Sequence, residues 1–361
     1  MTGGTRLRAP TAWRGGGVLA LLAAVAAFPL VFTNPLVTTF GVDTLIFVGA
    51  ASAWNIFSGY SGYISLGHAV FFGCGAYTVA ITARDWQLTG NVVFALLPLA
   101  GLAAAVIAVP FGMIALRVQR HTFLVVTIAI FFIFELMAFN FSFTGGTTGV
   151  AAPFLAWQPG TYDDPFYYIA LAIAVGTVGL SWVIRGSRFG LQLRAIRDDE
   201  GRARGLGVHT MRVKMAAFIV SAGVTGLIGG LWFYFITQVL PQSGFDPAFD
   251  LTVALMAFLG GLGTVSGPVL GALLIEPAQQ YLTQQFTNDY LSQIALGALF
   301  LAVIVLLPRG VIPMAGEKVT WWRAQRPRGT AALLAAAGLR RSVPAAEPGA
   351  AADAPSKETA R

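Results

Sequence analysis

The chain has 361 residues, of which 56% are hydrophobic and only 11% are charged. Soluble domains are about 45–50% apolar and about 25% charged, so this composition excludes an ordinary soluble protein and indicates a membrane protein. The net charge of +7 does not indicate nucleic-acid binding, because the cations lie in loops and tails between apolar segments, where membrane orientation explains them.

The apolar segments predict an all-α, polytopic membrane protein. A membrane helix needs about 20 mostly apolar residues to cross the hydrocarbon. Segments of this kind lie at 17–34, 41–58, 62–83, 91–116, 122–141, 166–184, 213–239 and 291–307. The first follows a basic N-terminus and imitates a secretory signal, but since further spans follow, we interpret it as a retained membrane helix.

The distribution of cations predicts which loops face the cytoplasm. Lysine and arginine are enriched on the cytoplasmic side of membrane proteins. The N-terminus (1–16) and the short loop with Arg117 and Arg120 are therefore expected inside the cell. The connection 185–214 contains seven arginines and one lysine and is expected to be the one long cytoplasmic loop.

Loops without cations are expected on the opposite side of the membrane. These are the loop 142–165 and the stretch containing Asp246 and Asp250. The transmembrane domain is then expected to span 17–310 of a plasma (inner) membrane protein. The tail 311–361 is expected in the cytoplasm, where its Ala-, Pro- and Gly-rich composition predicts disorder.

An apolar tract from Leu251 to Ala278 is too long for one crossing. A single crossing there would also give an even number of crossings before the C-terminal tail, whereas the predicted sides of the membrane require an odd number. Splitting it at 260–263, the sequence Gly-Gly-Leu-Gly, gives about ten membrane segments, some short or broken. Irregular backbone is tolerated at membrane depth only where it is buried in protein or lines a polar cavity. The break therefore hints at a transport path.

A weak internal repeat accompanies this break. Residues 62–68 (GYISLGH) are similar to 263–268 (GTVSGP), and each precedes an apolar segment. Both are expected near the cytoplasmic face, which would make the repeats parallel. Transporters often place their substrate site between such repeats, although glycine-rich packing alone would also produce the similarity.

No catalytic or metal-binding constellation is visible. The three histidines are far apart, Cys74 is the single cysteine, and no phosphate-binding loop occurs. We therefore expect no enzymatic activity, no metal and no cofactor. If ATP drives transport, another polypeptide hydrolyses it.

Polar residues within apolar segments are candidates for a transport path. Glu135 is the deepest; it either carries protons or contacts substrate, or, as we favour, hydrogen-bonds a neighbouring helix. Asp43 and Glu276 are expected near the membrane interface. Asn55 and His68 are expected to join helices. The candidate path residues are Gly62, Ser65, Gly67, His68, Glu135, Gly260, Gly261, Gly263 and Gly267. A second set is expected to form one helix-packing face: Gly223, Gly226, Gly229 and Gly230.

The basic connection is expected to contain a short helix that docks a soluble subunit. Asp198, Asp199 and Glu200 suit its first turn, and Gly205 and Gly207 would end it. The alternative is a solvated amphipathic loop on the membrane surface. The candidate coupling residues are Arg194, Arg197, Asp198, Asp199, Glu200, Ala203 and Gly207.

The stretch 194–207 resembles the cytoplasmic coupling motif of ABC-importer permeases, a Glu-Ala-Ala core followed by glycine. Together with 59–77, 214–223 and 260–268, it makes the region 41–310 resemble the M-type permeases of branched-chain amino-acid ABC transporters. Glycine and arginine at 201 and 202 replace the usual alanines, so the coupling helix is expected to be shorter or to start later.

The resemblance implies an alternating-access importer. Its implied partners are a homologous permease subunit, two ATP-binding cassette subunits and an extracytoplasmic substrate-binding protein. The implied substrates are branched-chain amino acids, or in similar permeases urea, short amides or small carboxylates. Two other classes stay open: an ion-coupled carrier that uses Glu135, and a passive channel or scaffold.

Overall fold

The computed structural model describes residues 22–32, 34–152 and 163–285, with single residues between 291 and 311. The expected cytoplasmic N-terminus (1–16), nearly all of the expected tail (311–361) and most of the expected last span lie outside the described residues. The description below concerns the unit Met1–Met314.

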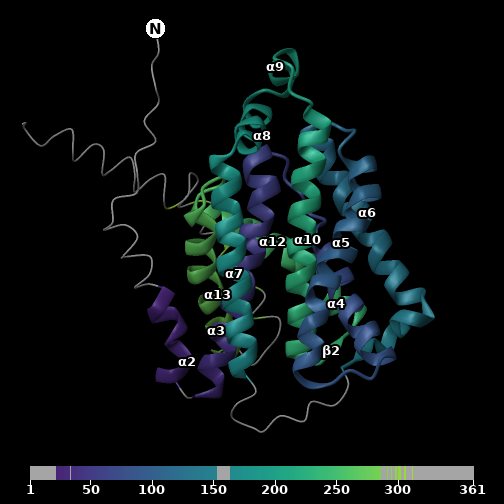
Figure 1. The fold of residues 1–361 in the computed structure, drawn as a ribbon, viewed down its shortest axis with the longest axis vertical. Coiled ribbons are helices and arrows are strands. Elements are labelled where there is room, and N and C mark those ends of the chain that lie inside the picture. The colour runs from purple at the N-terminus through teal and green to yellow at the C-terminus, as the bar shows by residue number, and fades with distance from the viewer. Residues whose placement is uncertain are drawn as a thin grey trace, which may run out of the picture. The chain divides into compact units, whose positions relative to one another are not determined.

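The described elements are helical apart from one short ribbon, and most helices lie side by side along one axis (Figure 1). The helices are α2 (Phe28–Val31), α3 (Pro35–Trp54), α4 (His68–Asp85), α5 (Leu97–Ala115), α6 (Arg120–Asn140), α7 (Asp163–Gly186), α8 (Arg188–Asp198), α9 (Glu200–Gly205), α10 (Thr210–Ile236), α11 (Pro241–Gly244), α12 (Pro247–Gly260) and α13 (Ser266–Gln285). A π-helical turn (Asn55–Gly59) extends α3, and 3-10 turns span Gly90–Leu96, Ser142–Thr144 and Gly146–Thr148.

The ribbon pairs β1 (Val150–Ala151) with β2 (Gln238–Val239) in antiparallel register, with Val150 opposite Val239. It lies at the end of the bundle opposite α8 and α9 (Figure 1). We call the α8–α9 end the coupling end.

The predicted fold class is confirmed. Among the described residues, five stretches are long and apolar enough to cross a membrane, and they coincide with five predicted spans. These are Leu36–Gly59, Gly90–Ala115, Arg120–Asn140, Asp164–Gly186 and Thr210–Ile236. The count of about ten segments stays a prediction.

The predicted break in the tract 251–278 is present, whereas the predicted span 62–83 starts late. Helix α12 ends at Gly260, and α13 starts at Ser266. Helix α4 starts only at His68, because residues 62–67 form an irregular segment whose backbone amides bind the side chains of Ser61 and Ser65. The chain thus forms two broken hairpins, α3–α4 and α12–α13.

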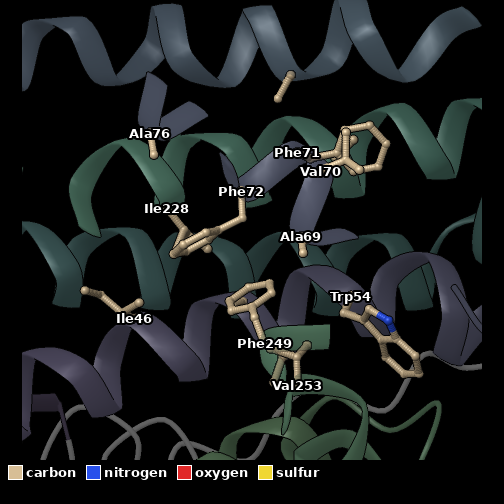
Figure 2. Close-up of a cluster of buried hydrophobic side chains, with 14 of the residues drawn as sticks. Ile46, Trp54, Ala69, Val70, Phe71, Phe72, Ala76, Ile228, Phe249 and Val253 are labelled. Carbon is tan, nitrogen blue, oxygen red and sulfur yellow. The ribbon is translucent and has the colours of Figure 1, made fainter. Parts of the chain in front are cut away.

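Small residues let α10 lie against α4 and α5 at the centre of the bundle. A methyl group placed on Gly226 would overlap Ala104, and one on Gly229 would overlap the backbone of Phe72. The predicted glycine face is therefore a packing surface, as is common where membrane helices approach closely. Beside it, Phe72 and Phe249 face each other with ring centroids 4.3 Å apart (Figure 2).

The outer faces of the bundle are apolar. On α6, for example, Val125, Ile133 and Leu136 are more than half exposed. Exposed apolar side chains at this density are costly in water and ordinary in lipid. They mark the surface that faces the hydrocarbon or a partner subunit.

One added methyl group at Gly75 is expected to destabilise the bundle, because it would overlap the backbone carbonyl of Gly226. Overpacking of this kind costs about 1–3 kcal/mol. Gly75→Ala should therefore lower the melting temperature of the detergent-solubilised protein by several degrees. The matched control is Gly176→Ala in α7, where nothing lies within 4 Å of the new methyl group. Equal losses in both variants would contradict the packing role.

Candidate functional site

Both hairpin breaks turn at a glycine in the left-handed region. Gly62 has φ +73° and Gly263 has φ +78°, a conformation that other residues rarely adopt. The similarity between 62–68 and 263–268 therefore has a structural counterpart. Each break follows a helix that runs toward the coupling end and precedes one that runs away from it.

The two breaks lie against each other. The side chain of Asn55 bridges them: its Oδ1 accepts a hydrogen bond from Gly263 N at 2.9 Å, and its Nδ2 donates to Thr264 O at 2.9 Å. Asn55 belongs to the π-helical turn, whose extra residue per turn shifts the direction of the polar side chain. The expectation that Asn55 joins helices is confirmed.

Arg197, near the end of α8, inserts between the breaks. Its Nη1 donates to Gly59 O at 2.9 Å. Its aliphatic stem lies against Gly62, and a side chain on Gly263 would overlap its guanidinium. Arg197 thus contacts both hairpins at once, and glycine at 263 leaves the space that the guanidinium occupies.

Arg120 fixes the backbone that carries Arg197. Its Nη2 donates to the carbonyl oxygens of Ile196 at 3.2 Å and Arg197 at 2.9 Å. These are terminal carbonyls of α8, which lack partners within the helix. Because Arg120 starts α6, the junction joins α6 and α8 to the two hairpins.

The irregular backbone of the first break is paired with side chains. Ser65 O accepts from Trp54 Nε1 at 2.8 Å, Ser65 N donates to Ser58 Oγ, and Leu66 N donates to Thr127 Oγ1. Unpaired backbone groups at membrane depth cost several kcal/mol each, so these partners are needed for the break to exist.

His68 lies beyond this break and is fully buried. Its Nδ1 is 2.9 Å from Ser65 Oγ, and its Nε2 is 2.8 Å from Ser221 Oγ. Since Ser221 donates its hydroxyl proton to Ala53 O, Ser221 accepts from His68 Nε2. The network is then complete with a neutral imidazole that accepts from Ser65. His68 joins α4 to α10, as expected.

A second polar cluster attaches α9 to the bundle. The Glu200 carboxylate accepts from Lys214 Nζ at 2.9 Å and from the Tyr63 hydroxyl, and Lys214 Nζ also donates to Tyr63 Oη at 3.1 Å. Burial alone would raise the pKa of Glu200, but hydrogen bonds from Tyr63 and Lys214 and the charge of Lys214 outweigh it, so the pKa lies below the ordinary carboxyl value. From the sequence, Lys214 was expected to be a cytoplasmic loop cation and the first residue of the stretch 214–223, without a partner.

The predicted coupling helix differs from α9 at its start. Asp198 is the last residue of α8, and Asp199 caps α9 by accepting from Arg202 N at 3.0 Å. Asp199 is extended and lies between the two helices, so Asp198, Asp199 and Glu200 do not share one helical turn as expected. Helix α9 is short, as expected, and ends at Gly205, with Gly207 at φ +86°.

Helix α8 was missed. Its signals are the cap at Ser187, whose Oγ accepts from Gly190 N, and the three-residue spacing of Gly190, Leu193 and Ile196, all buried. Four arginines between 185 and 197 obscured that pattern.

Two carboxylates lie deeper than expected. Asp250, expected in a loop, is buried in α12, where both its carboxylate oxygens accept from Ala69 N at 3.1 and 3.2 Å. It caps α4 at the positive end of the helix dipole and so joins the hairpins a second time. Glu276, expected at the interface, is also buried, with Gln280 Nε2 at 3.1 Å from its Oε1. For Asp250 a tertiary partner on α4 offsets the cost of burial, whereas the partner of Glu276 lies one turn further along α13.

A recess of about 110 Å³ lies between the same two hairpins on the other side of Asp250 from the breaks. Aromatic side chains from α3, α4, α10 and α12 line it, together with Asp246 and Gln279. The Gln279 Oε1 is buried without a hydrogen-bond partner among the described residues. An apolar recess with a few polar groups suits a small amphipathic solute.

The structure brings together eight of the nine candidate path residues around the two breaks. They are Gly62, Ser65, Gly67, His68, Gly260, Gly261, Gly263 and Gly267, all buried or half-buried. Glu135 lies apart, half-buried on α6 between exposed apolar neighbours.

Apolar spans, two broken hairpins and a charged helical segment at one end define a multi-pass membrane transport protein. The chain belongs to the family described as branched-chain amino acid transport system, permease component, whose model matches residues 36–304. This confirms the resemblance inferred for 41–310.

Relatives agree with this assignment. The permease protein LivM of the high-affinity branched-chain amino acid transport system of Salmonella typhimurium is 28% identical over 82% of this chain and 74% of its own length. The corresponding LivH protein of Escherichia coli is 26% identical over 73% of this chain and 89% of its own. No solved structure matches the chain significantly.

We expect the protein to lose more stability when Glu200 is replaced than when Lys214 is replaced. The Lys214 side chain is 4% exposed and that of Glu200 is 22% exposed. Glu200→Gln leaves the buried Lys214 ammonium with Tyr63 but without a counter-charge, and should cost about 1–3 kcal/mol. Lys214→Met leaves a carboxylate that keeps Tyr63 and water, so it should cost less, and the double variant should recover part of the loss.

Thermal unfolding of the four proteins measures this coupling. The control is Arg204→Gln, which removes an exposed ion-pair partner of Glu200 and should cost at most about 0.5 kcal/mol. Because the folded-state pKa of Glu200 is lowered, its contribution is complete above the unfolded carboxyl pKa and is lost as the pH falls through the folded value. A coupling energy unchanged in acid would contradict the assignment.

Proposed function

We propose that this chain forms one half of the translocation path of an ATP-driven importer and works by alternating access. One observation carries the proposal: a single residue of the α8–α9 segment, Arg197, contacts both hairpin breaks, while the recess lies between the same hairpins farther from the coupling end. Force applied to α8–α9 would therefore reach both hairpins together.

We place the coupling end in the cytoplasm, on the basis of its arginines. The termini would lie on the same side, and 17–310 would be the transmembrane domain. Helix α9 projects from the bundle (Figure 1), with Arg202 and Leu206 highly exposed, the latter at 84%. An exposed leucine beside charged groups suits contact with a soluble subunit. The coupling segment comprises Arg194, Arg197, Asp198, Asp199, Glu200, Ala203 and Gly207.

Motion would enter through two connections. Glu200 connects α9 to α10 through Lys214 and to the first break through Tyr63. Arg197 connects α8 to Gly59 in the first hairpin and to Gly263 in the second. The glycines around the breaks would act as the gate on the cytoplasmic side. The recess would then belong to the side from which substrate enters.

The proposed partners follow from the family. LivM and LivH relatives match this one chain, which supports pairing with a second, homologous permease subunit. Two ATP-binding cassette subunits would supply the force, and an extracytoplasmic binding protein would deliver substrate. The substrates would be branched-chain amino acids; urea, short amides or small carboxylates are alternatives within the family. The chain itself would catalyse no reaction.

Uptake into proteoliposomes tests this function directly. The chain would be reconstituted with its partner permease, ATP-binding subunits and binding protein, and radiolabelled leucine uptake followed. Uptake should require hydrolysable ATP. Uptake by the chain alone, driven by a proton gradient and abolished by Glu135→Gln, would instead establish an ion-coupled carrier.

Arg197→Gln is expected to uncouple transport from ATP hydrolysis. Substitutions within a coupling network change coupling by about 0.5–2 kcal/mol, so leucine transported per ATP should fall between about twofold and about thirtyfold. Complex assembly and ATPase activity should persist, because the exposed face of α9 is unchanged. The control is Arg188→Gln, which removes the same charge from an exposed position on α8. Equal ratios for the two variants would refute the role of Arg197.

A further inference from the structure

A basic cavity of about 500 Å³ lies beside the coupling segment, bordered by Glu200 and by Tyr63 of the first break. Residues from the α5–α6 connection, α9 and the start of α10 line it. Its charged residues are Arg117, Arg120, Arg204, Lys214 and Glu200. Four cations face one carboxylate, so the cavity is strongly positive.

Some of these cations are not fully paired with other groups of the protein. Lys214 neutralises Glu200, and Arg120 directs Nη2 toward the α8 carbonyls. Arg204 approaches Glu200 only at 3.4 Å and its side chain is 71% exposed. Arg117 is exposed and makes no hydrogen bond or ion pair within the described part of the chain. Positive charge in excess of the internal pairs thus remains at the cavity.

Two long helices also begin at this cavity. Gln119 and Arg120 start α6, Thr210 and Met211 start α10, and all four line the cavity. The side chains of the N-cap residues Gln119 and His209 do not cap these helices, although Thr210 N already donates to Val208 O. Uncapped N-termini present free amides and the positive end of the helix dipole, an arrangement that binds phosphate and other anions. The cations and the helix N-termini are independent features, and both favour an anionic ligand.

The cavity lies where apolar spans end. Helix α5 ends at Ala115 and α6 starts at Arg120, and both expose apolar side chains immediately beyond the cavity, such as Ile114 and Val125. These spans place the cavity at the depth of lipid headgroups. Basic pockets between membrane helices at this depth suit anionic headgroups.

We propose that this cavity binds an anionic phosphate group, with Arg117 and Arg204 as its ligands and the N-termini of α6 and α10 as supporting donors. An acidic phospholipid headgroup or a soluble phosphate compound would supply this chemistry. The bound phosphate would brace α9 against the α5–α6 connection.

Native mass spectrometry and thermal unfolding of the full-length chain in mild detergent test the site. Phosphatidylglycerol, inorganic phosphate and zwitterionic phosphatidylcholine are titrated separately. Phosphatidylglycerol should bind and stabilise the protein more than phosphatidylcholine does. Stabilisation by inorganic phosphate at millimolar levels would also support the site and would identify a soluble ligand as its source.

Arg117→Gln should weaken phosphatidylglycerol binding roughly fivefold, the effect of about one cation near a membrane surface. Arg117→Lys should retain most of the affinity. The matched control Arg188→Gln removes an exposed arginine at the same end of the bundle, outside the cavity, and should not change binding. Equal weakening by both glutamine variants, or no preference for any anionic probe, would overturn the proposal.

Discussion

The guanidinium of Arg197 occupies the point where two interrupted membrane helices meet. A cation at such a position is tolerated only if carbonyl oxygens replace its water, and Gly59 supplies one at 2.9 Å. The glycine at 263 is equally necessary, because any side chain there would occupy the space of the guanidinium. One side chain thus makes the geometry of both breaks depend on the position of α8.

The rest of the polar interior is organised around this junction. Asn55 binds the second break from the first, and Asp250 caps α4 from α12. Glu200, Lys214 and Tyr63 secure α9 to the same region. Each of these polar side chains pairs with groups that lack a helical partner where a helix is interrupted. The interruptions are therefore stable only with the polar residues present, and the polar residues are stable in the interior only beside the interruptions. A packed set of such contacts favours discrete arrangements over gradual deformation, which suits a gate with two states.

Sequence patterns predicted five of the spans and the position of the second break, because hydropathy and glycine runs are local signals. They also identified Asn55 and His68 as polar contacts between helices. The partners could not be inferred: Asn55 binds Gly263, 208 residues away. Asp250 was expected in a loop without cations on the extracytoplasmic side, whereas its place in α12 depends on α4. Arg197 was selected for its expected contact with a soluble subunit, and its inward contacts with the breaks were not foreseen.

Hydrogen–deuterium exchange, followed by mass spectrometry on the wild-type chain and Arg197→Gln, tests most directly whether one guanidinium holds both hairpins. Removing it should speed amide exchange in the two breaks together, at 59–66 and 261–265, while the α10 core keeps its protection. Faster exchange confined to α8, or in a single break, would contradict the account.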